Sequence, residues 1–153
     1  MKIGEQKRIP ANRVGNKQHQ HIFGGYNWRQ DRISWTTAKT KNTEQFIRFL
    51  EHLLVDKYPT GRVVLVMDNA AYHKSAASLA ALSLFEHRVM VIWLPPYCSD
   101  LNAIERFWRH LKDLASANKL ENNIQDVVKA VQKIMKQQNK PSSTLRFHVS
   151  KNL

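Results

Sequence analysis

Two acidic residues stand at positions in this sequence where side chains that do chemistry are often held. Asp68 follows directly after the apolar run Val63–Met67, and Glu105 lies early in a later segment that has helical spacing. Hard divalent cations such as Mg²⁺ take carboxylate oxygens as ligands and keep several waters, so a few carboxylates suffice to hold one. Two such ions commonly catalyse phosphoryl transfer on nucleic acid, one activating the nucleophile and one stabilising the leaving oxygen. Asp68 and Glu105 are therefore candidate ligands of a catalytic metal.

Each of these acids also has an ordinary structural explanation. Asp68 and Asn69 are typical of a turn that follows a strand. Glu105 stands four residues before Arg109, which is the spacing of an ion pair on a helix surface. An acid is also favoured in the first turn of a helix by the helix dipole. The spacing of the two acids alone leaves both explanations open.

The elements around the two acids would bring them to one edge of a sheet. The segments Arg62–Met67 and Val89–Leu94 are short and apolar, as in strands that are buried on both faces. An Ala- and Leu-rich helix is predicted between them over 74–87, and an amphipathic helix after the second, with Ser99 or Asp100 as its N-cap. Strands joined by a helix pair in parallel, and their carboxyl ends meet at the same edge. A ligand at the end of the first strand and another on the second helix can therefore converge.

The segments on either side extend this pattern into a mixed α/β sheet. His21–Arg29 and Arg32–Thr40 predict a β-hairpin, in which Gly24 and Gly25 mark a bulge or a close backbone approach. Asn42 or Thr43 can cap the helix that follows.

We expect three regions in the chain: a basic arm or loop over 1–19, one α/β domain over 20–140, and a tail over 141–153.

The charge of the chain indicates its partner. Lys and Arg number 24 against 12 Asp and Glu in 153 residues, a formal net charge of +12 spread along the sequence. Such a surface attracts polyanions and releases their counterions. Nucleic acid is the expected partner, with an acidic membrane surface as the alternative. No apolar run approaches the roughly 20 residues that span a bilayer, so no membrane-embedded segment is expected.

The single cysteine, Cys98, excludes an internal disulfide and a zinc site built from several cysteines. One unpaired cysteine fits a reducing compartment, so we expect a cytoplasmic location, associated with the nucleoid if the host is bacterial.

Two segments together resemble a known family. VVLVMDNAAYHKS followed by VIWLPPYCSDLNAIERFW is similar to the DDE transposases of the Tc1/mariner superfamily, and the bacterial insertion sequence 630 type is the nearest branch. The shared pattern is an apolar strand, Asp68-Asn69 with His73 behind it, a second strand, Leu94–Tyr97, and then Asp100–Asn102 and Ile104-Glu105. Cys98-Ser99 replaces the usual Ser-Pro and Ala103 replaces the usual Pro, and neither change touches an acid.

The resemblance implies an RNase H-like fold, that is, a mixed α/β sheet with flanking helices. It implies DNA cleavage and strand transfer in DNA transposition, a form of DNA recombination and integration, with Mg²⁺ or Mn²⁺ as cofactor. Asp68 would be the second acid of the catalytic triad and Glu105 the third. Supporting roles beside these acids, or in capping the helix that presents Glu105, are implied for Asn69, His73, Asp100 and Asn102.

The family's first catalytic Asp has no counterpart here. Glu5 is the only acid among the first 30 residues, and Asp31 falls in the hairpin turn. We therefore expect the RNase H-like sheet to lack its first, central strand and the metal to bind weakly, if at all. The expected protein is the carboxy-terminal part of a catalytic domain, inactive alone, which a second polypeptide supplying the amino-terminal part could complete.

Two other functions stay open beside this one. The chain could be a noncatalytic DNA-binding or regulatory fragment, which would show no metal-dependent turnover. It could also be a related metal-dependent RNase H-like nuclease that acts on RNA, although the Asp-Leu-Asn-Ala-Ile-Glu segment belongs to the transposase pattern. A homodimer is compatible with all three.

Basic residues on two segments are candidates for contacts with DNA. In the hairpin, Tyr26, Trp28 and Trp35 alternate with Arg29 and Arg32, so bases could stack beside phosphate contacts. Ordinary packing of a hairpin is the alternative. On the helix that carries Glu105, the candidates are Arg109 and Lys112. A stripe of lysines on the outer side of the last helix could touch a DNA backbone or simply be solvated: Lys129, Lys133, Lys136 and Lys140.

Overall fold

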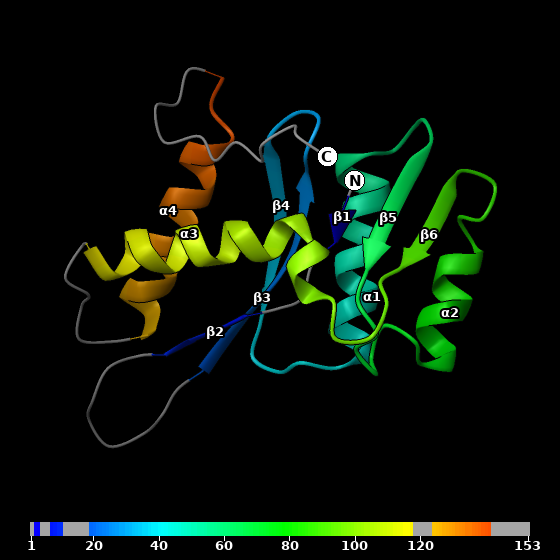
Figure 1. Ribbon diagram of the computed structural model, residues 1–153, viewed down its shortest axis with the longest axis horizontal. Coiled ribbons are helices and arrows are strands. Elements are labelled where there is room, and N and C mark those ends of the chain that lie inside the picture. The colour runs from blue at the N-terminus through cyan, green and yellow to red at the C-terminus, as the bar shows by residue number, and fades with distance from the viewer. Residues whose placement is uncertain (1, 4–6, 11–18, 118–123, 142–153) are drawn as a thin grey trace.

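A computed structural model of the chain describes residues 2–3, 7–10, 19–117 and 124–141. These residues form one mixed sheet of six strands with helices packed on both faces (Figure 1). The strands are β1 (Lys2–Ile3), β2 (Lys7–Pro10), β3 (His19–Asn27), β4 (Arg32–Ala38), β5 (Val63–Met67) and β6 (Val89–Trp93). The helices are α1 (Thr43–Glu51), which continues as the π-helical η1 (His52–Lys57), then α2 (Ala76–Ser83), the 3-10 turn η2 (Ser99–Leu101), α3 (Ala103–Ala117) and α4 (Ile124–Gln138).

The hairpin and the parallel strands of the sheet are confirmed. β3 and β4 pair antiparallel from His21 opposite Ala38 to Asn27 opposite Arg32. β5 and β6 pair in parallel, and their ladder ends with Met67 opposite Trp93. The carboxyl ends of β5 and β6 therefore lie at one edge of the sheet, as the sequence predicted.

The sheet was expected to lack its first, central strand, and this expectation needs one correction. The two-residue strand β1 lies between β3 and β5, because Lys2 pairs antiparallel with Tyr26 and in parallel with Val66. β2 continues along the same edge of β3, with Lys7 opposite Ile22. Residues 2–3 and 7–10 are thus strands and not part of an arm or loop. The long strand β3 has an edge whose backbone groups need partners, and these segments supply them. The predicted tail lies outside the described residues after Pro141.

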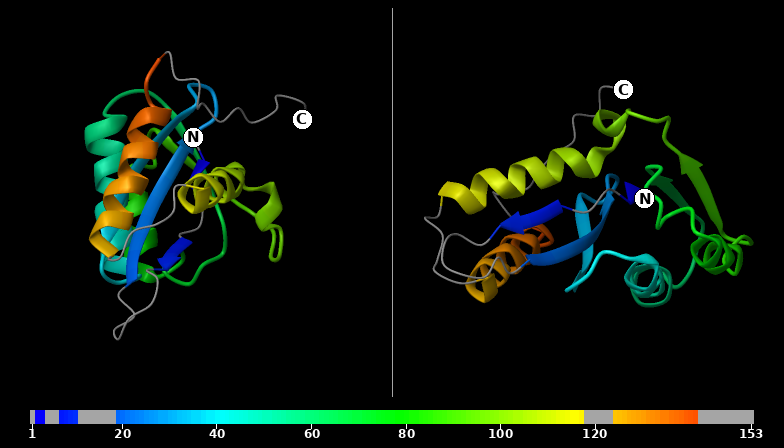
Figure 2. Two further views of the ribbon diagram at one scale, coloured as in Figure 1. Left: turned by 90° about the vertical axis from the view of Figure 1, so that its left-hand side faces the viewer. Right: turned by 90° about the horizontal axis from the view of Figure 1, so that it is seen from below.

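Two buried clusters hold the helices to the sheet. The first lies under α1, η1 and α2 and includes Phe46, Phe49 and Leu65; the second lies under α3 and α4 and includes Tyr26, Phe107 and Trp108. Figure 2 shows α3 crossing the sheet on the side away from α1. The N-cap of α1 follows the sequence: the Asn42 side chain accepts a hydrogen bond from the Gln45 N–H at 3.0 Å. No helix among the described residues is long and apolar enough to cross a membrane.

The prediction that β5 and β6 are buried on both faces is wrong. On one face, Leu82 of α2 belongs to the same buried cluster as Leu65 of β5 and Val89 of β6. On the other face, α3 contacts β1 and β3. The uncovered side chains include Val64, Met90 and Ile92, which are 39%, 63% and 46% exposed. An unbroken apolar run predicts a strand correctly, but it does not reveal which helix covers each face.

Gly24 provides the close approach that was predicted for the hairpin. A Cβ at this position would lie 2.6 Å from the Trp108 ring and 3.2 Å from Ile104. The absence of a side chain on β3 therefore allows the first turns of α3 to press against the sheet. Because Glu105 lies between Ile104 and Trp108 in sequence, this contact fixes the backbone of α3 at Glu105 relative to the sheet.

Candidate functional site at the carboxyl ends of β5 and β6

The loops that leave β5 and β6 are tied to each other. The Leu94 N–H donates to the Met67 carbonyl at 2.8 Å, which extends the parallel ladder by one residue. The Asn69 side-chain amide donates a hydrogen bond to the Leu94 carbonyl. Asn69, for which the resemblance implied a supporting role, therefore bridges the loop after β5 and the loop after β6.

The two oxygens of the Asp68 carboxylate have different surroundings. Oδ1 lies 2.8 Å from His73 Nδ1 and accepts the Ala70 N–H at 3.0 Å. Among the described residues, Oδ2 has no such partner. The Asp68 side chain is 18% exposed. One oxygen is thus held by the fold, while the other is left for a ligand.

His73 positions Asp68 from the interior. Its side chain is 1% exposed, and its ring packs against Phe46 and Tyr72 with centroids 4.5 and 4.4 Å apart. Nδ1 also lies 3.3 Å from the Asp68 backbone carbonyl. Since both neighbours of Nδ1 are acceptors, this nitrogen carries the proton and donates. His73 is therefore a positioning residue for the carboxylate.

Asp68 remains ionised in this environment. Burial raises the pKa of its carboxyl, but the hydrogen bonds from His73 and the Ala70 N–H, together with the charges of His73 and Lys41, outweigh burial, and the pKa lies below its ordinary value of 3.8. An ionised carboxylate with one uncommitted oxygen is a suitable ligand for a hard cation.

A cavity of about 240 Å³ opens beside Asp68. Its walls are the loop after β5, residues 68–70, and the loop after β6, residues 94–99. Tyr97 in the second loop has a positive φ of 60° and a fully exposed side chain. Glu105 does not line this cavity, so its position relative to Asp68 is set by α3 and not by the cavity wall.

Glu105 lies in the first turn of α3 and is 9% exposed. The turn is organised by Asn102, which is 1% exposed: its carbonyl accepts the Glu105 N–H at 3.0 Å and its side-chain oxygen accepts the Ile104 N–H at 3.4 Å. The residue that caps α3 is therefore Asn102. The predicted caps Ser99 and Asp100 lie instead in the exposed turn η2, because the chain makes one 3-10 turn before the helix begins.

Comparison with known proteins identifies the family. A profile described as DDE superfamily endonuclease matches residues 1–128. The chain belongs to the DDE superfamily endonuclease family. It is also 25% identical over 132 residues to the insertion element IS630 uncharacterized 39 kDa protein of Shigella sonnei. That match covers 86% of the chain but 38% of the relative, so the chain spans well under half of that protein's length.

Solved structures confirm the fold of this DDE chain. The catalytic domain of Mos1 mariner transposase matches with a TM-score of 0.68 at 18% identity, covering 88% of this chain and 69% of that one. A structure of the Mos1 domain with raltegravir and Mn matches with a TM-score of 0.64 at 16% identity, covering 97% and 84%. The RNase H-like fold of transposase catalytic domains is therefore the fold of this chain.

The donor set of this DDE chain fits a divalent cation in part. Asp68 offers a free, ionised oxygen, and Glu105 is a second carboxylate on the helix that follows the adjacent strand. No group of three or more His, Cys, Asp or Glu side chains that could hold a metal occurs within the described residues. The pair fits as part of a ligand set, and the set needs a further ligand.

The residues predicted to contact DNA are not brought together. Arg29 is exposed beside Trp28, with its guanidinium 5.6 Å from the ring centroid. Arg32 instead donates to the backbone carbonyl of Asn139 after α4. The remaining two, Arg109 and Lys112, are exposed on α3.

Sequence reasoning missed the part played by η1. Lys57 and Tyr58 lie at its end and line a cavity together with Trp35 of β4 and Lys136 of α4. The lysine stripe of α4 was visible in the sequence, but nothing in the sequence signals that the end of η1 faces it. Tyr26, grouped with the tryptophans as a possible stacking residue, is fully buried in the core.

Proposed function

We propose that this chain is part of the catalytic core of a DDE transposase that cleaves DNA and joins its ends to new sites. The observation that carries the proposal is the arrangement at Asp68. One carboxylate oxygen is fixed by His73 and Ala70, the other is uncommitted, and the carboxylate lines a cavity at the edge of the sheet. Family membership supplies the reaction class.

In this proposal Asp68 and Glu105 are the second and third acids and hold Mg²⁺ or Mn²⁺. When bound, such ions activate the attacking hydroxyl and stabilise the leaving oxygen of a phosphodiester. Mn is present in one solved structure of Mos1. His73 keeps Asp68 ionised and correctly oriented, and Asn69 holds the two loops together. Asn102 fixes the first turn of α3 and with it the backbone at Glu105.

We further propose that the two acids do not turn over DNA without a third. Two carboxylates leave a pair of metal ions incompletely coordinated, because each ion takes about six oxygen ligands, only some of which are water. A second polypeptide that supplies an acid beside β5, or a homodimer, could complete the set. The DNA-binding function then exists without turnover, which keeps a noncatalytic role as the second candidate.

Nicking of a supercoiled plasmid tests this proposal. With Mg²⁺ or Mn²⁺ present, we expect the chain alone to nick no faster than Asp68→Asn or Glu105→Gln, since both variants remove a ligand from an already incomplete set. Metal-dependent nicking that both substitutions abolish would contradict the proposed inactivity and show that the described acids suffice. Nicking that neither substitution affects would contradict the proposed roles of Asp68 and Glu105.

A further inference from the structure

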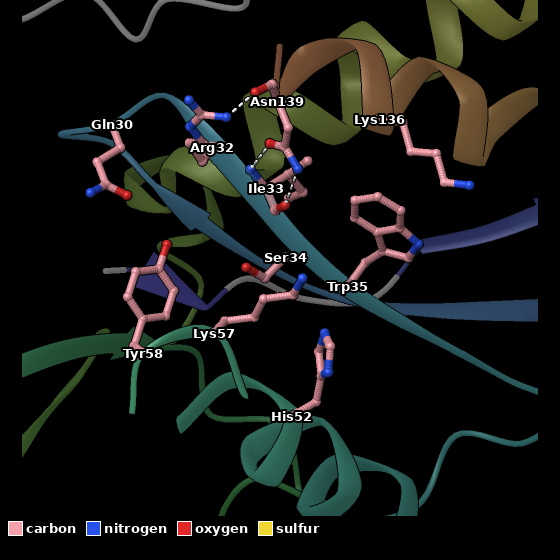
Figure 3. Close-up of a pocket in the computed structure, with 10 residues that line it drawn as sticks. All are labelled: Gln30, Arg32, Ile33, Ser34, Trp35, His52, Lys57, Tyr58, Lys136 and Asn139. Carbon is pink, nitrogen blue, oxygen red and sulfur yellow. Dashed lines mark hydrogen bonds between the residues drawn. The ribbon is translucent and has the colours of Figure 1, made fainter. Parts of the chain in front are cut away.

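A larger cavity lies away from the candidate metal site, along the outer edge of β4. Its volume is about 660 Å³, and its walls come from β4, from η1 and from α4 (Figure 3). Figure 3 shows Trp35 in the wall, with Lys57 and His52 reaching toward it from the η1 side and Lys136 extending from α4. We call this cavity the edge groove.

The walls of the edge groove are fixed by hydrogen bonds to the backbone of β4. Among the strands that the structure describes, β4 pairs only with β3, so its other edge has no strand partner there. The Asn139 side chain accepts the Ile33 N–H at 2.8 Å and donates to the Ile33 carbonyl at 2.8 Å, as a neighbouring strand would. Arg32 donates to the Asn139 backbone carbonyl. The position of the end of α4 against β4 is therefore built into the fold and needs no ligand to form.

The edge groove carries positive charge that the fold leaves uncompensated. Arg32, Lys57 and Lys136 line it, and no acidic side chain does. Within the part of the chain that the structure describes, none of the three forms an ion pair. His52 is different, because its Nδ1 lies 3.1 Å from Asp56. Three uncompensated cations around one cavity select an anionic ligand.

The positive charge continues along α4. Lys136 also lines a shallow second cavity of about 380 Å³ whose other cations are Lys129, Lys133 and Lys140. Lys129, Lys133 and Lys136 recur along one face of α4 over about 10 Å, at about 1.5 Å per residue, and Lys140 follows just after the helix ends at Gln138. That length matches about three nucleotides of a stacked DNA strand, at about 3.4 Å per nucleotide. A linear polyanion fits this track better than a single phosphate does.

Two aromatic side chains add a second kind of contact. Trp35 packs against the core on one side and lines the edge groove, and Tyr58 lines it from the end of η1. Asn27 donates to the Tyr58 hydroxyl at 3.1 Å, which fixes that ring. Aromatic rings beside a basic track are how proteins bind unpaired bases, because every base can stack and every nucleotide carries a phosphate.

We propose that the edge groove and the lysine stripe of α4 bind single-stranded nucleic acid. A base stacks on Trp35, while phosphates contact Lys57, Lys136 and the other lysines of the stripe. The site is separate from the candidate metal site: β3 and β1 lie between β4 and β5, so about 14 Å separates the strands, at about 4.8 Å per strand. The proposal goes beyond the proposed cleavage and requires neither a metal nor Asp68.

A second copy of the chain is a poorer occupant of this edge. Open strand edges can pair with each other, but a two-fold pairing of β4 would bring Arg32, Lys57 and Lys136 of both copies together. Like charges at a strand edge oppose such pairing. The same charges favour nucleic acid, whose phosphates displace their counterions when they bind.

Fluorescence anisotropy of a short fluorescein-labelled oligothymidylate, in EDTA, tests the cationic part. For Lys57→Gln/Lys136→Gln we expect affinity to fall at least about tenfold and the slope of log K against log salt to drop by about 1.4, at about 0.7 per lost contact. Lys39→Gln/Arg106→Gln makes the same charge change at two exposed residues that line neither cavity, and should weaken binding less than about threefold. Equal weakening by the two double variants would overturn the proposal.

An abasic strand of the same length tests the stacking part. Wild-type protein should bind oligothymidylate at least about fivefold more tightly than the abasic strand, because stacking contributes per base. Trp35→Leu should abolish that difference, and circular dichroism checks that the variant is folded. If the wild type binds both strands equally, the assignment of Trp35 as a stacking platform is overturned, whatever the stability of the variant.

Discussion

At Asp68 the two carboxylate oxygens have different surroundings. Oδ1 is held by His73 and the Ala70 N–H, and Oδ2 has no such partner among the described residues. The family resemblance implied a supporting role for His73, and in the structure its Nδ1 lies 2.8 Å from Asp68 Oδ1. A turn residue alone would not need a buried histidine behind it.

The lowered pKa of Asp68 predicts a dependence of stability on pH. A carboxyl with a pKa below its ordinary 3.8 in the folded state contributes stability that is fully present above that value and is lost as the pH falls through the folded pKa. In EDTA, urea unfolding of the wild type should therefore lose more stability between pH 6 and pH 3 than Asp68→Asn does. Asp113→Asn, on the exposed side of α3, is the control, and equal slopes for the wild type and Asp68→Asn would contradict the assignment.

At the scale of elements, the contact between β3 and α3 depends on a missing side chain. Gly24→Ala places a Cβ 2.6 Å from the Trp108 ring, and we expect a loss of about 1–3 kcal/mol in the free energy of unfolding. The clashing atoms belong to the six-membered ring of the indole. Trp108→Phe removes them, so the cost of Gly24→Ala should shrink in that background. Additive costs in the double variant, measured by urea unfolding, would mean that the clash is not the cause.

The attachment of α4 to β4 depends on Asn139. Asn139→Ala removes two hydrogen bonds of 2.8 Å to the Ile33 backbone, and we expect a loss of about 1–2 kcal/mol and faster hydrogen exchange at the Ile33 amide. Gln137→Ala, on the same turn of α4, should change neither. An Ile33 amide that stays equally protected in Asn139→Ala would show that other contacts hold the helix end.

The elements differ in how far sequence could predict them. The hairpin, α1, β5, α2, β6 and α3 follow from apolar spacing and caps, because these signals lie within a few residues of each other. The helical spacing placed the cap of α3 at Ser99 or Asp100, since an extra 3-10 turn leaves no clear local signal, whereas the family resemblance also implied Asn102. β1 was not predicted because two residues become a strand only through the strands on either side. The edge groove is lined by three elements that are distant in sequence. Only their packing places Lys57 and Lys136 in the wall of the same cavity.

At the scale of the whole molecule, charge and fold distinguish two candidate functional surfaces. The carboxyl ends of β5 and β6 carry Asp68 and the loop that leads to Glu105. The outer edge of β4 carries the edge groove, with the lysines of α4 beside it. The net charge of +12 predicted nucleic acid as the partner, and the fold shows where uncompensated cations gather. Cleavage and binding can therefore be tested by separate variants of the same chain.

The proposal for the metal site is that Asp68 and Glu105 bind the same divalent cation. The measurement is a titration of isotope-labelled protein with Mn²⁺, following the paramagnetic broadening of backbone amide signals by NMR. We predict that amides of residues 68–70 and 102–105 broaden at the same Mn²⁺ concentration, and that either Asp68→Asn or Glu105→Gln removes both effects. Broadening that appears at only one of these segments, or that survives both substitutions, would contradict a shared site.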